Sequence, residues 1–234
     1  MGVWAFVLVG VIIVAIAVYS EAQRRQALGP VAKALGLGFS GGPQPLPAEL
    51  ESAGFYLFTQ GPPEDLNLMR GRRGGYEVAL FGYGYDAAQG EEGSREIPVG
   101  DAGQIERRLQ TVLWAKAAGQ TLPDFDLSPT RESLRRVGQR FGLVPVSIDG
   151  RADFRERYLL SARDAAVLRA VFMPAVLDAL VAEPGWFIEG RGNQWLFYRV
   201  KERVAPEAMA AFLDRGLGLI ETLLGAAPGS GAAR

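Results

Sequence analysis

The segment Trp186–Val200 (WFIEGRGNQWLFYRV) gives the clearest fold signal in the chain. Two short runs of aromatic and aliphatic residues, 186–189 and 194–200, flank Gly-Arg-Gly-Asn at 190–193. This pattern predicts a β-hairpin, because glycine and asparagine readily adopt the backbone angles of a tight turn. The aromatic side chains are interpreted as the core face of that hairpin rather than as a ligand site.

Helical patterns lie on both sides of this hairpin. Before it, residues 157–160 are a short predicted strand, and Ser161–Asp164 has the Ser-x-x-acid spacing of a capping box that begins a helix. Pro174 either kinks that helix or starts a second one over 175–182. After the hairpin, Pro206 predicts the start of a final amphipathic helix.

The earlier half of the chain has the pattern of a β-meander. The aromatic run Phe55–Thr59 predicts a strand. Residues 67–70 and 76–85 flank the glycine- and arginine-rich segment 71–75, which predicts a hairpin with a longer loop. Residues 107–116 contain Thr, Val and Trp and are predicted to return as the partner strand of 76–85.

A short extended edge is predicted at 122–127, followed by a helix that Ser128 caps and that runs to about Arg140. Strands and helices together indicate an α+β class, with an antiparallel sheet and packed helices. One domain is expected, with a subdivision near 142–150.

The first residues have a different character from all the others. From Gly2 to Tyr19 there is no charge and no proline, and about twenty helical residues span roughly 30 Å, the thickness of the hydrocarbon core of a bilayer. We therefore predict an N-terminal transmembrane helix over 1–20. A cleaved signal peptide is one alternative, since small residues surround Ser20, but no Lys or Arg precedes Arg24. A buried core helix is the other alternative.

The charges next to this segment predict its orientation. Arg24, Arg25 and Lys33 follow the apolar run, against Glu21. Basic residues near the end of a membrane helix stay in the cytoplasm. The prediction is a single-pass protein of the bacterial inner (cytoplasmic) membrane with its N-terminus outside and its domain in the cytoplasm.

The predicted organisation follows the composition of successive segments. A juxtamembrane helix with a break at Pro30 follows the anchor, and a Pro/Gly-rich stretch reads as a linker. The predicted units are a transmembrane helix at 1–20, a juxtamembrane helix at 21–39, a linker at 40–48, a soluble domain at 49–225 and a disordered tail at 226–234.

Composition excludes several kinds of chemistry. The chain has no His and no Cys, which removes Ser-His-Asp and Cys-His nucleophile systems and the usual zinc sites. The net charge is -1, so no global attraction to nucleic acid is expected. We predict no cofactor and no metal site. Asp124 and Asp126 are the best lone metal candidate, although a solvated pair is favoured.

Arg70, Arg72 and Arg73 crowd one predicted hairpin loop. Guanidinium groups beside glycine backbone suit an anion or a lipid phosphate, and a solvated turn is the plainer interpretation. A second group of arginines lies in the predicted helix after Pro129. Gly36–Gly41 matches G-x-G-x-x-G, but a helix precedes it, so it predicts the end of a helix rather than a nucleotide site.

Five pieces of sequence occur together in this chain: Asn67–Gly71 (NLMRG), Val78–Tyr85 (VALFGYGY), Leu122–Pro129 (LPDFDLSP), Tyr158–Leu160 with 167–172 (VLRAVF), and Glu189–Gly192 (EGRG). Together they resemble a set of uncharacterised bacterial proteins with one N-terminal transmembrane helix. In that pattern Asp stands at the position of Gly82 and Glu at the position of Thr130, so this chain lacks two carboxylates. The resemblance implies an anchor with a soluble α+β domain and no known activity.

Three functions remain open on these observations. The first is a non-enzymatic, membrane-anchored accessory protein whose domain binds a protein partner in a larger membrane complex. The second is a module that binds anionic lipid or phosphate at the membrane surface through Arg70, Arg72 and Arg73. The third is a carboxylate-based enzyme, which requires two acidic residues to converge in one cleft.

Overall fold

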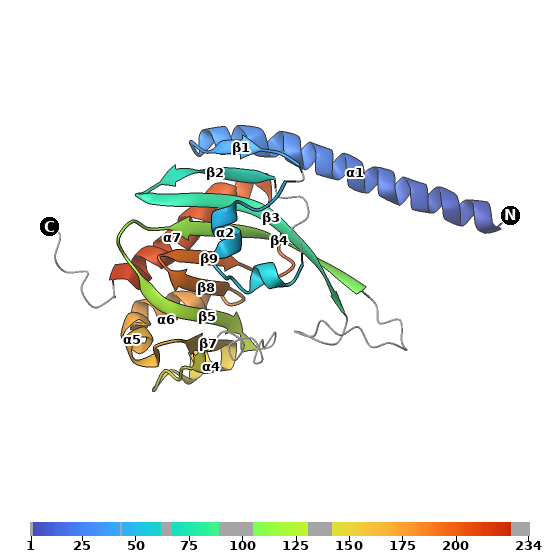
Figure 1. Cartoon of the computed structure of the whole chain (residues 1–234). Helices are drawn as coiled ribbons and strands as arrows, with labels where there is room; N and C mark the ends of the chain where they lie inside the picture. The colour runs from blue at the N-terminus through green and yellow to red at the C-terminus, as the bar shows by residue number, and fades with distance from the viewer. Residues whose placement is uncertain (1, 43, 62–66, 89–104, 131–141, 226–234) are drawn as a thin grey trace.

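The hairpin predicted at 186–200 lies in the middle of a nine-stranded antiparallel sheet (Figure 1). Its strands β8 (Phe187–Gly192) and β9 (Gln194–Tyr198) insert between β4 (Ile105–Lys116) and β5 (Leu122–Pro129), which are consecutive in sequence. The predicted α+β class with an antiparallel sheet is confirmed. The computed structural model describes residues 2–42, 44–61, 67–88, 105–130 and 142–225.

The other strands extend the sheet on both sides of this hairpin. Next to β4 lie β3 (Tyr76–Ala88), β2 (Leu68–Arg73) and β1 (Gly38–Ser40). Next to β5 lie β7 (Tyr158–Ala162) and β6 (Val144–Pro145). Strand β4 pairs along almost the whole of β3, as predicted. Elements from before and after the predicted subdivision therefore belong to one sheet.

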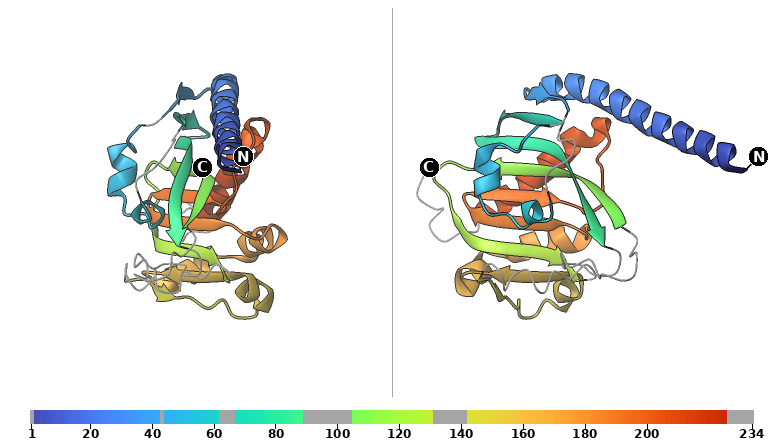
Figure 2. Two further views of the ribbon diagram at one scale, coloured as in Figure 1. Left: turned by 90° about the vertical axis from the view of Figure 1, so that its right-hand side faces the viewer. Right: turned by 45° about the vertical axis from the view of Figure 1, so that its right-hand side comes forward.

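One face of the sheet is covered by helices (Figure 2). We call it the helix face. Buried side chains of these helices share one apolar cluster with the sheet, including Leu168, Leu180 and Leu213. The helices are α1 (Gly2–Ala34), α4 (Ala152–Arg157), α5 (Ala165–Val171), α6 (Pro174–Ala182) and α7 (Met209–Gly225), the last preceded by the 3-10 turn η3 (Pro206–Ala208).

Of the residues that the structure describes, one segment covers the opposite face: residues 44–61, which we call the strap. It contains the short helix α2 (Ala48–Ser52) and the 3-10 helix η1 (Leu57–Thr59). Figure 2 shows it on the side of the sheet away from α6 and α7. Because side chains alternate along a strand, Trp195 and Phe197 of β9 face the helices, whereas its other aromatic residue, Tyr198, belongs to the cluster under the strap.

Three predictions about the strap and β5 are wrong. Phe55–Thr59 does not form a strand, because a buried carboxylate accepts its backbone N–H groups at Tyr56 and Leu57 in place of a neighbouring strand. Residues 122–127 are not an edge, since β5 pairs with both β7 and β8. The helix expected from Ser128 does not start there, because β5 continues through that residue; residues 131–141 lie outside the described residues.

Three local details also differ from expectation. Asp164, not Ser161, caps α5, accepting bonds from two backbone N–H groups, because β7 extends through Ser161. The hairpin between β2 and β3 turns on Gly74 and Gly75 alone, with φ of 57° and 86°, which suits a two-residue turn. Helix α1 continues through Pro30, because packing of its buried side chains on both sides outweighs the missing hydrogen bond.

Candidate functional site

Helix α1 joins the predicted anchor to the domain without interruption. Its first part projects away from the sheet, while its last turns lie along the domain (Figure 1). Leu28, Ala32 and Leu35 are buried there in the cluster of the helix face. By contrast, Val18 and Tyr19 are 65% and 66% exposed. The helix therefore leaves the domain near residue 20, where the predicted anchor ends.

A group of polar contacts fixes α1 at this point. Glu21 accepts hydrogen bonds from Arg203 (2.6 Å) and from the side chain of Asn67 (3.0 Å). Asn67 is buried, has a φ of 39°, and also accepts from the backbone N–H of Gly42 at 3.1 Å. Arg24 donates to the carbonyl oxygen of Val204 at 2.7 Å. We call Glu21, Arg24, Asn67 and Arg203 the helix base.

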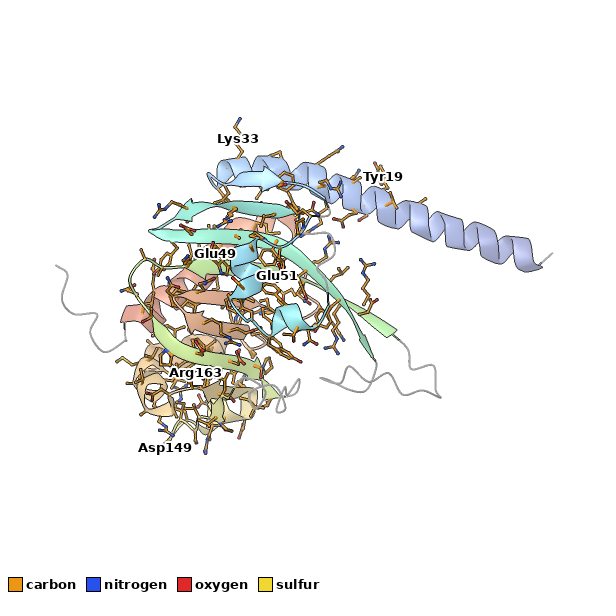
Figure 3. The ribbon with its side chains drawn as sticks, in the orientation of Figure 1. Tyr19, Lys33, Glu49, Glu51, Asp149 and Arg163 are labelled. Atoms are coloured by element: carbon orange, nitrogen blue, oxygen red, sulfur yellow. The ribbon has the colours of Figure 1, made fainter. Side chains whose placement is uncertain are left out.

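The three basic residues predicted to flank the anchor lie in different surroundings. Arg24 is turned into the domain; burial, and then repulsion from Arg203, lowers its pKa. Arg25 lies against Gly41, where an added Cβ would be 3.0 Å from Arg25 Cδ. Lys33 lies at the other end of the docked helix from Tyr19 (Figure 3). Arg24 and Arg25 are thus close to the exit of the helix, and Lys33 is not.

The three arginines of the predicted loop belong to strand β2, and the turn itself is Gly74 and Gly75. Arg70 reaches the strap face, where it lies 3.0 Å from Glu49 and packs over the ring of Trp114. Arg73 reaches the helix face, 3.4 Å from Asp214 of α7. Arg72 is exposed. The structure does not bring Arg70 and Arg73 together, so the three side chains do not form one cradle.

The G-x-G-x-x-G segment ends α1, as predicted. Gly36 has a φ of 72°, and the backbone N–H of Leu37 donates to the carbonyl of Ala32 at 2.8 Å. This is the geometry with which glycine terminates a helix. The edge strand β1 follows at once.

A buried charged cluster lies between the strap and the sheet, and sequence reasoning did not assemble it. Asp126 of β5 and Glu189 of β8 are direct cross-strand partners. Arg191 lies two residues beyond Glu189, and its guanidinium is 2.8 Å from Asp126 and 3.5 Å from Glu189. The signal available in the sequence was Glu-Gly-Arg at 189–191, whose alternation places both charges on one face of a strand.

Glu189 receives donors from several elements. The backbone N–H groups of Tyr56 and Leu57 donate to its two oxygens at 2.5 and 3.1 Å. The hydroxyl of Tyr198 donates at 3.0 Å. Burial, followed by repulsion from Asp126, nevertheless raises the pKa of Glu189 to about 7. Burial also raises the pKa of Asp126, against the attraction of Arg191.

Two acidic residues thus converge, as a carboxylate-based enzyme requires, but the strap closes them off. The side chain of Glu189 is 4% exposed and that of Arg191 is 9% exposed. In this arrangement a substrate does not reach Glu189. Asp124, the other member of the suggested metal pair, lies 3.2 Å from Arg163. Within the described residues, no three His, Cys, Asp or Glu side chains gather in a way that suits a metal ion.

The described residues contain no single helix with both the length and the hydropathy of a membrane span. Two consecutive helices, Ala165–Val171 and Pro174–Ala182, satisfy both criteria only when taken together, and they meet at 76°.

Comparisons with known proteins give one result at the level of fold. No protein-family model and no curated protein matches the chain. A crystal structure of the mycobacterial trehalose monomycolate transport factor A, TtfA, superposes with a TM-score of 0.53 at 13% sequence identity. The match covers 89% of this chain and 96% of that one. Over most of its length the chain therefore has a fold similar to that of TtfA.

Proposed function

We propose that the chain is a single-pass, membrane-anchored accessory protein without catalytic activity, whose α+β domain binds a protein partner in a transport-associated complex of a bacterial inner membrane. Residues 1–20 are its anchor and the domain lies in the cytoplasm. The proposal concerns location and mode of action; it assigns no transported substrate.

The observation that carries this proposal is the continuity of α1. Its charge-free first part, residues 2–19, suits the hydrocarbon core of a bilayer, and the following turns are built into the domain core. The helix base adds polar contacts where α1 leaves the domain. A domain held this way stays beside the bilayer in one orientation, as expected of a subunit that meets an integral membrane partner.

Two further observations support the accessory role. The fold is similar to that of a protein described as a transport factor. The described residues also lack an accessible catalytic arrangement, since the converging carboxylates are covered by the strap.

The anchor is tested by making it polar. The double variant Val9→Asp, Val14→Asp should move the full chain from the carbonate-resistant membrane fraction to the soluble fraction, because a central Asp in a membrane helix costs about 3 kcal/mol. Val9→Leu with Val14→Leu is the matched control and should stay in the membrane. Retention of the Asp variant in the membrane would contradict an anchor at 1–20.

Orientation is tested with a single cysteine, since the chain has none of its own. Lys33→Cys in the full chain should react with a membrane-impermeant maleimide only after the inner membrane is broken. Reaction in intact spheroplasts would place the domain on the outside.

The partner is sought by purifying the intact chain in a mild detergent and measuring co-purifying proteins by mass spectrometry. We expect an integral membrane protein at a constant ratio across detergents, and its absence from the Val9→Asp, Val14→Asp preparation. A monodisperse, partner-free chain in several detergents would contradict the accessory role.

A further inference from the structure

The strap is fastened to the sheet mainly through one buried carboxylate. Glu189 accepts the backbone N–H groups of Tyr56 and Leu57, at the start of η1. Arg191, beside it, donates to the carbonyl oxygen of Gly54 at 3.2 Å. Three of the four positions from Gly54 to Leu57 thus bond through their backbone to two side chains of β8.

The remaining polar contacts of the strap are more exposed. Glu49 of α2 forms ion pairs with Lys116 and Arg70, and these side chains are about one-third exposed. The hydroxyl of Tyr83 donates to the carbonyl oxygen of Gly61 at 2.7 Å. Ion pairs at such exposure contribute little, about 0–1 kcal/mol each. Burial of Leu50 and other apolar side chains supplies the rest.

The buried cluster that holds the strap has more acidic than basic side chains. Asp126 and Glu189 are directly opposed across two strands, and like charges in that position repel. The guanidinium of Arg191 forms ion pairs with both carboxylates. Two carboxylates and one arginine carry a net negative charge in a buried site, and the uptake of one proton makes the cluster neutral.

Among the described residues, Arg191 is the one cation whose charge acts on the pKa of Glu189 or of Asp126. The other groups that act on the two carboxylates are Tyr83 of β3, Tyr198 of β9 and Asp124 of β5. From the strap, the backbone N–H of Tyr56 donates to Glu189. Burial raises the pKa of Tyr83 and of Tyr198, so both stay neutral near pH 7. The groups of the cluster that take up or release a proton near pH 7 are therefore its two carboxylates.

We propose that the strap is a proton-controlled cover: it lies on the sheet while the Asp126–Glu189 pair holds one proton, and it separates from the sheet more often once the pair has lost that proton. Separation uncovers the aromatic face of β3, β4 and β9, including Phe81 and Trp114. The inference concerns the domain alone and does not depend on the anchor or on a partner.

The direction of the pH dependence follows from the linkage between proton binding and the position of the strap. With the strap in place the pKa of Glu189 is about 7, above its ordinary value, and with the strap lifted water reaches the carboxylate and restores that ordinary value. A group whose pKa is raised in one state stabilises that state at low pH. The stabilisation is complete below the ordinary pKa of a glutamate and disappears as the pH rises through about 7.

The experiment compares two buried alanines on opposite faces of the sheet. Ala79 lies in the cluster under the strap and Ala115 in the cluster of the helix face, and both are 0% exposed. Each is replaced by cysteine in the full chain, Ala79→Cys or Ala115→Cys, and the rate of reaction with a small thiol reagent is measured against pH. The ratio of the two rates cancels the pH dependence of thiol reactivity.

We expect this ratio to rise on the order of tenfold between about pH 5.5 and about pH 7. Adding Glu189→Gln should make the ratio nearly independent of pH, because the amide keeps the shape of the side chain without titrating. Hydrogen exchange of residues 54–61, corrected for intrinsic rates, gives a second readout that needs no cysteine. A ratio and an exchange rate that stay constant over this range, or an unchanged rise in Glu189→Gln, would overturn the proposal.

Discussion

The two faces of the sheet are covered in different ways. On the helix face, α7 alone has 17 residues, and its buried side chains join those of α1, α5 and α6 in one large apolar cluster. On the strap face, the longest helix among the described residues is α2, with five residues, and a buried carboxylate accepts backbone N–H groups of the strap. The first cover is held by apolar burial along its whole length, and the second by apolar side chains together with a few charges.

Because of this difference, we expect the strap to separate from the sheet more readily than the helices do. Apolar burial does not depend on pH, and a helix packed along its length separates only when the domain unfolds. A short segment held around one titratable cluster opens locally and responds to protons. Substitutions on one face should therefore weaken the cover of that face more than the cover of the other.

The largest effect is expected for Arg191→Met. Removing the guanidinium leaves Asp126 and Glu189 buried without their counter-ion, which costs about 4 kcal/mol in the free energy of unfolding. The loss should be smaller near pH 5, where the carboxylates take up protons. Denaturation of the full chain in detergent, followed by tryptophan fluorescence, measures it. Arg163→Met is the control, because Arg163 is 60% exposed and should change the free energy by less than about 1 kcal/mol.

Shortening one buried leucine on each face of the sheet should distinguish unfolding of the whole domain from local opening of the strap. Leu213→Ala, on α7, is expected to lower the free energy of unfolding by about 3 kcal/mol, because a fully buried leucine leaves a cavity. It should leave the thiol reactivity of Ala79→Cys unchanged in native conditions. Leu50→Ala, equally buried in the strap, should instead raise that reactivity. Equal effects of both variants on Ala79→Cys would mean that the two covers open together.

Two glycines of α7 give a matched pair on the helix face. A Cβ at Gly216 would lie 2.3 Å from Leu113 Cδ2, whereas a Cβ at Gly218 meets nothing within 4 Å. Gly216→Ala should therefore destabilise the domain by about 1–3 kcal/mol, through forced repacking. Gly218→Ala should stabilise it by about 0.5–1 kcal/mol, because alanine is the better helix former. Thermal unfolding of both variants tests this, and the same sign for both would contradict the close packing of α7.

The smallest effect is expected at the exposed end of the strap. The hydrogen bond from Lys116 lowers the pKa of Glu49, so its contribution is present at neutral pH and lost only well into the acid range. Glu49→Gln should lower the free energy of unfolding by less than about 1 kcal/mol. It should raise the reactivity of Ala79→Cys slightly at all pH values, while the pH dependence stays that of the wild type. Loss of that pH dependence would locate the titrating group at Glu49 rather than at the Asp126–Glu189 pair.

The local elements could be predicted from the sequence where pattern and turn residues agree. The hairpin at 186–200, the pairing of 76–85 with 107–116, and the helix after Pro206 all follow from short-range signals. The end of α1 at Gly36 follows from the same kind of signal. These features need only a few neighbouring residues to be specified.

The long-range arrangement could not be predicted in this way. No local pattern says that β8 and β9 separate β4 from β5, because the pairing depends on contacts between distant segments. Phe55–Thr59 has the composition of a strand, yet Glu189, more than a hundred residues away, accepts its N–H groups. The same insertion brings Asp126 opposite Glu189, so the charged cluster became visible only with the sheet order.

The continuity of α1 has a mechanical consequence for the proposed anchoring. A helix that is too long or too short for the local bilayer tilts to match its thickness. Because the last turns of α1 are part of the domain core and Glu21 ties the helix to Asn67 and Arg203, the domain has to turn with it. Membrane thickness, and any partner that changes it locally, would thus set the angle at which the sheet faces the bilayer.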